Sequence, residues 1–113
     1  FTLSVERRAE IRTLIGERAE RLSYLNCAVL RASIERNLDS DEGPFAIDDR
    51  ICGEVVELSR EDFDDLVRVH LCDWLEQVPR SQEWTYRRDA YRRMAEWLGG
   101  VALESFEQVY AGH

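Results

Sequence analysis

Two titratable side chains three residues apart, His70 and Asp73, are the strongest candidates for chemistry in this sequence. On a helix, side chains at this spacing are neighbours, so both can reach one metal ion or one substrate group. Glu76 adds a third polar group further along the same segment. Burying an ionised carboxylate is costly unless it is paired or bound to a cation, so an aspartate on a core-facing stripe needs a partner. The pattern indicates a metal site with Asp73 and His70 as ligands and Glu76 as a group that orients them.

The same residues also fit a purely structural role. Asp73 can accept hydrogen bonds from an arginine or from a helix N-terminus. His70 can be a core histidine whose hydrogen bonds are satisfied within the protein. We favour the structural interpretation for each residue taken alone, and the metal site stays open beside it.

Arginines that follow Pro79 supply a second candidate, a phosphate site. Arg88 and Arg92 are four residues apart and share a helix face, as guanidinium pairs that bind phosphate often do. Together with Arg80 they are the candidate phosphate-binding residues. The alternative is a solvated face whose exposed ion pairs contribute little to stability, because acids are interleaved with the arginines, namely Glu83, Asp89 and Glu96.

Composition narrows the class of protein. The 113 residues suit one domain, and 23 acidic against 15 basic residues give a net charge of −8. A field of that sign repels nucleic acid and anionic lipid, and no apolar run approaches the length of a membrane span, so neither partner is expected. Three cysteines without a CxxC pair argue against a disulfide framework and suit a reducing cytoplasm. No Gly-rich loop follows a strand, which excludes P-loop and Rossmann phosphate sites.

The first part of the chain, up to the loop over 39–44, is expected to be helical. Ser4 is a suitable N-cap for a first helix. Gly16 is expected to end or kink that helix before a second helix, which runs to about Leu30. A short helical turn over 33–38 and a loop over 39–44 follow. The apolar stripe of the first helix comprises Val5, Ile11, Leu14 and Ile15.

Over residues 45–58 the spacing of apolar residues changes from the helical period to that of a strand. This pattern predicts a β-hairpin that turns at Cys52 and Gly53. Three helices are expected after it. Ser59 caps the first, and Gly99 with Gly100 ends the second. The three helices cover residues 60–77, 84–98 and 101–110. The sequence therefore predicts an all-α fold, an orthogonal bundle of about five helices with a small hairpin inserted near residues 45–58.

The run V-H-L-C-D-W-L over 69–75 resembles a helix of RelA/SpoT-type HD phosphohydrolases, in which V-x-L-A-D-x-L supplies the last metal-ligating aspartate. The matching position is Asp73. The resemblance implies an all-helical fold, a divalent metal (Mn, Fe or Zn) and hydrolysis of a nucleotide pyrophosphate.

Longer motifs resemble a bacterial HD-like domain family of unknown function. They are R-x-x-I-R-x-L-I-G-E-x-A-E-x-L from Arg8, D-R-x-x-G-E from Asp49, W-L-E-Q-V-P-R from Trp74 and Y-R-R-M-A-x-x-L-G-G from Tyr91. This resemblance implies that residues 1–113 form a single helical domain, the C-terminal part of a longer HD-like domain. Because His70 and His113 are the only histidines here and neither stands in a His-Asp pair, it also implies that the histidine ligands precede Phe1.

Two functional hypotheses follow. In the first, the chain is part or a remnant of a metal-dependent nucleotide phosphohydrolase, in which a divalent ion on Asp73 activates a water while arginines hold phosphate. In the second, it is a non-catalytic helical module that binds a protein partner, a second copy of itself or a small ligand between helices. The first predicts that His70 and Asp73 face a common cavity, and the second that each is hydrogen-bonded within the protein and sealed off.

Overall fold

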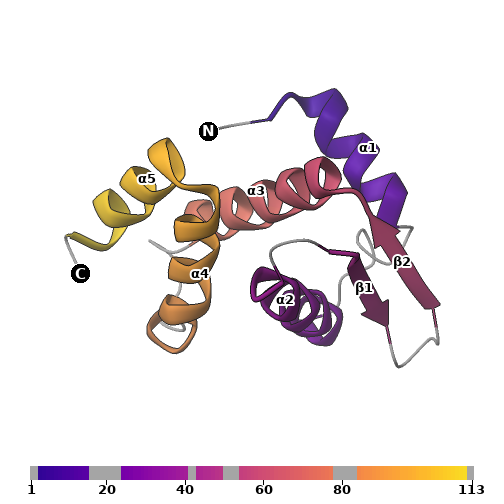
Figure 1. Cartoon of the computed structure of the whole chain (residues 1–113). Coiled ribbons are helices and arrows are strands. Elements are labelled where there is room, and N and C mark those ends of the chain that lie inside the picture. Colours follow the sequence, from indigo (N-terminus) through magenta and orange to yellow (C-terminus); the bar gives the residue numbers. More distant parts are fainter. Residues whose placement is uncertain (1–2, 16–23, 41–42, 50–53, 78–83, 112–113) are drawn as a thin grey trace.

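A computed structural model describes residues 3–15, 24–40, 43–49, 54–77 and 84–111 of the chain. Within them, helix α3 lies at the centre, α1 lies along one side of it, α2 and α4 lie on the other, and α5 follows α4 near one end (Figure 1). This arrangement confirms the predicted all-α fold with a small hairpin. The elements are α1 (Val5–Ile15), α2 (Tyr24–Leu38), β1 (Phe45–Asp49), β2 (Glu54–Leu58), α3 (Arg60–Gln77), α4 (Trp84–Leu98) and α5 (Gly100–Ala111).

Helix α3 is central because its apolar residues surround most of its circumference. Ser59 begins it as predicted, since its hydroxyl accepts a hydrogen bond from the Asp62 amide at 3.1 Å. A helix that is apolar on several sides must be covered from several sides. The other elements provide that cover. The buried apolar side chains of α3 are Phe63, Leu66, Val67, Val69, Leu71, Cys72, Trp74 and Leu75.

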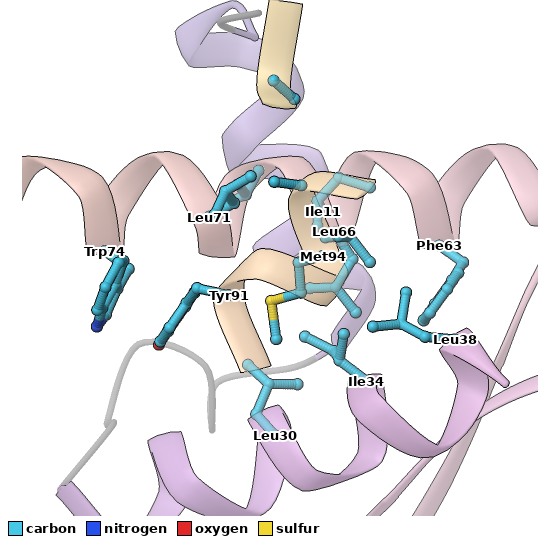
Figure 2. Packing of buried hydrophobic residues seen from close by; sticks show 14 of the residues in the cluster. Ile11, Leu30, Ile34, Leu38, Phe63, Leu66, Leu71, Trp74, Tyr91 and Met94 are labelled. Atoms are coloured by element: carbon cyan, nitrogen blue, oxygen red, sulfur yellow. The ribbon is translucent and has the colours of Figure 1, made fainter. Parts of the chain in front are cut away.

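Helix α2 differs from the prediction, which separated a helix ending near Leu30 from a short turn over 33–38. The structure has one uninterrupted helix, because Leu30, Ile34 and Leu38 recur every four residues on one face. Figure 2 shows these three side chains directed toward α3 and α4. The predicted break at Gly16 lies outside the described residues.

Helix α1 is capped as predicted, with the Ser4 hydroxyl 3.1 Å from the Arg7 amide. Ile11 and Ile15 are buried, in agreement with the expected stripe. Val5 and Leu14 do not follow it, since their exposed fractions are 79% and 42%. Burial of α1 therefore rests on two isoleucines, and the rest of its attachment to α3 is polar.

The hairpin pairs Phe45 with Leu58 and Ile47 with Val56 in antiparallel register. Phe45, Ile47 and Leu58 are buried, so one face of the hairpin joins the core. The predicted turn at residues 52–53 lies outside the described residues. Asn37 at the end of α2 fixes β1 in place, because its amide group donates to the Ala46 carbonyl at 2.8 Å and accepts from the Ala46 amide at 3.1 Å.

Two glycines join α4 to α5, as predicted. Gly99 and Gly100 adopt φ values of 68° and 49°, which are strained for other residues. The Gly99 amide closes α4 by donating to the Ala95 carbonyl at 2.8 Å. Helix α5 then folds back so that Ala102, Phe106 and Tyr110 are buried. Among the described helices, none is long and apolar enough to cross a membrane.

Candidate functional site

His70 and Asp73 lie on the side of α3 that α1 covers. Both are half-buried, as expected for side chains at the seam between two helices. Arg8 and Arg12, one turn apart on α1, meet the Asp73 carboxylate. Nη2 of Arg8 donates to Oδ1 at 2.9 Å, and Nη2 of Arg12 donates to Oδ2 at 3.1 Å. Each oxygen of Asp73 thus accepts a charge-assisted hydrogen bond from a different guanidinium.

A second polar contact between the same helices lies at Arg7. Its Nε donates to Asp65 and its Nη2 to Asp62, both at 2.7 Å, so the guanidinium joins two carboxylates of α3. Asp65 also accepts from Arg68 at 2.7 Å. The hydrogen bond from Arg7 lowers the pKa of Asp62, because it favours the ionised carboxylate. Helix α1 is therefore held to α3 by two groups of ion pairs, one at Arg7 and one at Asp73.

The His70 ring is held by an aromatic neighbour on α4. Its Nε2 and the Tyr91 hydroxyl are hydrogen-bonded at 3.2 Å, and the two rings stack with centroids 5.5 Å apart. Tyr91 stacks in turn on Trp74 at 3.8 Å, and Trp74 stacks on Tyr110 at 5.5 Å. Figure 2 shows Trp74 and Tyr91 beside each other in the core. These stacked rings connect His70 and Trp74 of α3 to Tyr91 of α4 and Tyr110 of α5.

A small hollow of about 70 Å³ lies between α1, α2 and α3. Its walls combine aliphatic side chains with three polar ones, so it has an apolar interior and a charged rim. His70 and Asp73 both line it, although each is also hydrogen-bonded to protein groups. The shared hollow is the feature expected under the first hypothesis. The hydrogen bonds are expected under the second, but its expectation that both residues are sealed off is not met. The lining residues are Ile11, Arg12, Ile15, Leu30, Leu66, Val69, His70 and Asp73.

A second, larger hollow of about 350 Å³ lies where α4 turns into α5. The described residues that line it are Leu3, Leu98, the two glycines, Val101 and Ala102, with Arg68 as the charged side chain among them. Arg68 already pairs with Asp65 at 2.7 Å. No titratable group predicted from the sequence reaches this hollow, so the candidate site remains the one beside Asp73.

Glu76, Arg88 and Arg92, the remaining candidate residues within the described part of the chain, are not among the residues that line the hollow beside Asp73. Glu76 is exposed. Arg88 is exposed and lies over the Tyr110 ring at 5.2 Å, and Arg92 pairs with Glu96 at 3.5 Å on its own helix. Arg80 lies outside the described residues. The pair formed by Arg92 is thus of the exposed, helical kind that the sequence offered as the alternative to a phosphate site.

Metal ligation was predicted for Asp73 and His70. Within the described part of the chain, no three His, Cys, Asp or Glu side chains lie close enough together to hold a metal ion. The two residues share a hollow, but Asp73 is already neutralised there by guanidinium groups. The metal site therefore stays a prediction, with a competing partner now identified on α1.

Sequence reasoning anticipated an arginine as one possible partner of Asp73, but it did not identify which one. Arg8 and Arg12 are four residues apart, flanking Ile11, and so share the face of α1 that meets α3. That spacing was the available signal. Comparisons with protein-family models, with curated proteins and with solved structures found no match to this chain.

Proposed function

We propose that this chain is a non-catalytic helical binding module that takes a small molecule in the hollow between α1, α2 and α3. One observation carries the proposal: the Asp73 carboxylate accepts hydrogen bonds from both Arg8 and Arg12. A carboxylate held in this way acts as an anchor between helices. The hollow beside it offers an apolar interior and charged rim groups, which is the usual composition of a ligand site.

The arrangement favours binding over metal-dependent catalysis because of charge. A divalent cation at Asp73 would sit among two guanidinium groups within hydrogen-bond reach of the same carboxylate, and like charges repel. To ligate the ion, Asp73 would have to weaken or give up those hydrogen bonds, and α1 would lose one of its two described polar contacts with α3, keeping the one at Arg7. His70, the nearest other candidate ligand, uses Nε2 in its hydrogen bond with Tyr91.

The deciding experiment is the metal content of the protein purified without chelators, beside its Asp73→Ala variant. Asp89→Ala, which removes an exposed carboxylate from α4, is the matched control. We expect no stoichiometric metal in any of the three proteins. Near-stoichiometric Mn, Fe or Zn that disappears only in Asp73→Ala would overturn the proposal.

A second candidate is that the chain belongs to an HD-like, metal-dependent nucleotide phosphohydrolase. The observation that favours it is that His70 and Asp73 line one hollow. In this function Asp73 binds the divalent ion and His70 with Glu76 orients groups around it, while Arg80, Arg88 and Arg92 hold phosphate. The test is hydrolysis of nucleotide pyrophosphates with added Mn²⁺, and loss of that hydrolysis in Asp73→Ala would support this function.

Both candidates place the protein in a reducing compartment, which we propose to be the cytoplasm. Cys72 supports this location, because it is a free thiol buried in the core. Buried free cysteines behave as small apolar side chains and are common where disulfides do not form.

A further inference from the structure

The hollow beside Asp73 has a floor and a rim of different chemistry. Its floor is aliphatic and comes from three helices, with Ile11 and Ile15 from α1, Leu30 from α2, and Leu66 and Val69 from α3. These five side chains are buried, so an alkyl group among them would leave water completely. The rim carries Arg12, His70 and Asp73. A ligand that fits must have an apolar part and one polar end.

The charge of the rim selects the sign of that polar end. Among the described residues, two guanidinium groups, those of Arg8 and Arg12, contact the carboxylate of Asp73, so these ion pairs hold two positive charges and one negative charge. In a chain of net charge −8, a local excess of positive charge beside a hollow favours an anion.

Arg12 is the group that can meet the anion. Among the described residues it donates one hydrogen bond, to Asp73, out of the five N–H donors of a guanidinium. Its side chain is 39% exposed, so it also retains contact with solvent. Because Arg8 holds the other oxygen of Asp73, Arg12 can turn toward a ligand without leaving that carboxylate uncompensated.

The size of the hollow limits the ligand. A cavity of roughly 150 Å³ holds benzene, which has six non-hydrogen atoms. A hollow of about 70 Å³ therefore has room for a few such atoms inside, with the polar group at the rim. This admits an alkyl chain of one to three carbons and leaves no room for a nucleotide.

We propose that the hollow binds a short-chain monocarboxylate of two to four carbons, such as acetate, propionate or butyrate. The carboxylate accepts hydrogen bonds from Arg12, and the alkyl chain lies among Ile11, Ile15 and Leu66. This inference rests on the proposed binding function and names its ligand class. An affinity on the order of millimolar follows, because a ligand of four to six atoms makes few contacts.

The test is a titration of the whole chain followed by two-dimensional NMR, with the backbone amides and the methyl groups of the hollow as reporters. The probes are sodium acetate, propionate, butyrate and hexanoate at constant ionic strength, with 1-butanol and n-butylammonium as controls of matched size. Saturable shifts at Ile11, Ile15 and Val69 with propionate and butyrate are expected. Hexanoate and n-butylammonium should bind at least about fivefold more weakly, because one is too long and the other carries the wrong charge.

Two variants separate the roles of rim and floor. Arg12→Gln should weaken butyrate binding at least about tenfold, as expected for loss of a charge-assisted hydrogen bond. Arg93→Gln removes an exposed arginine of α4 and should leave binding unchanged. Val69→Leu fills part of the hollow and should weaken butyrate more than acetate, which a general loss of folding would not do.

Each other outcome has a definite meaning. Absence of saturable shifts with all four acids overturns the ligand class, as does binding of 1-butanol that equals binding of butyrate. A separate titration with MnCl₂ tests the proposed function. Broadening of signals centred on Asp73 would overturn that function, whether or not the carboxylates bind. An equal loss of butyrate binding in Arg12→Gln and Arg93→Gln would overturn the assignment of Arg12.

Discussion

Replacing Asp73 by alanine tests the anchoring role of this carboxylate through stability. The change leaves Arg8 and Arg12 without their common partner at the seam between α1 and α3. A fully exposed ion pair contributes about 0.2–1 kcal/mol, whereas breaking a fully buried one costs about 3–5 kcal/mol. The Asp73 side chain is 35% exposed, so solvent screens both ion pairs. The contribution of each pair should therefore lie near the range for exposed pairs.

The expected magnitude follows from these bounds. Two pairs at about 1 kcal/mol each give a loss of about 2 kcal/mol, and the better helix propensity of alanine recovers about 0.5 kcal/mol. Asp73→Ala should therefore lower the free energy of unfolding by about 1.5 kcal/mol. For a domain of this size that corresponds to a fall in Tm of roughly 5 °C. Urea denaturation at low ionic strength measures it, and 1 M NaCl should reduce the difference.

Double-mutant cycles of Asp73→Ala with Arg8→Gln and with Arg12→Gln serve as the control, because they separate the coupling between Asp73 and each arginine from other effects of the substitutions. Each cycle should return a coupling of about 0.5–1 kcal/mol, because both arginines contact the same carboxylate. A variant Asp73→Ala that is as stable as the wild type, or more stable, would refute the reasoning. Such a result is typical of a carboxylate kept for function at a cost in stability, as a metal ligand would be.

Three further predictions concern other parts of the molecule. Asn37→Ala should lower the free energy of unfolding by about 2–3 kcal/mol in urea denaturation, because three hydrogen bonds of a buried amide are lost. Burial raises the pKa of Tyr110, so the folded state disfavours its phenolate. Stability should therefore be retained below about pH 10 and fall as the pH rises above it, and Tyr110→Phe should lessen that fall in melting curves between pH 8 and 11. Burial also raises the pKa of the Cys72 thiol, so in a Cys27→Ser, Cys52→Ser variant iodoacetamide should modify it at least about tenfold more slowly than a cysteine peptide.

Each of these predictions has an outcome that contradicts it. A loss below about 0.5 kcal/mol in Asn37→Ala would mean that the hairpin does not depend on this amide. Identical alkaline melting of Tyr110→Phe and wild type would mean that the buried phenol does not oppose ionisation. Modification of Cys72 at the rate of the free peptide would mean that the core around it opens readily.

The central and C-terminal elements were predictable because their signals are local. Ser59 caps α3 through its own hydroxyl, and Gly99 and Gly100 adopt backbone angles that favour glycine. The predicted end of the second helix near Leu30 was wrong, because tertiary packing decides where helix α2 ends. Ile34 and Leu38 continue the stripe of Leu30, so packing against α3 and α4 stabilises one continuous helix through these residues.

The candidate site could be predicted in part. The spacing of His70 and Asp73 correctly placed them on one face of one helix, and the cost of burying a carboxylate indicated that Asp73 has a partner. The identity of that partner depends on a contact between residues 61 to 65 positions apart in the chain. Local patterns carry no information on such a contact, since it depends on how α1 docks.

The docking of α1 links the two candidate functions, because it uses the carboxylate that a metal would use. As long as Arg8 and Arg12 occupy Asp73, α1 stays on α3 and completes the hollow with Ile11 and Ile15. A metal ion on Asp73 would displace both guanidinium groups and weaken one of the two polar contacts of α1, leaving the one at Arg7. Under the two proposed functions, a metal ion and the guanidinium groups of Arg8 and Arg12 compete for the same carboxylate, so the metal proposed for Asp73 and the ligand proposed for the hollow should weaken each other's binding.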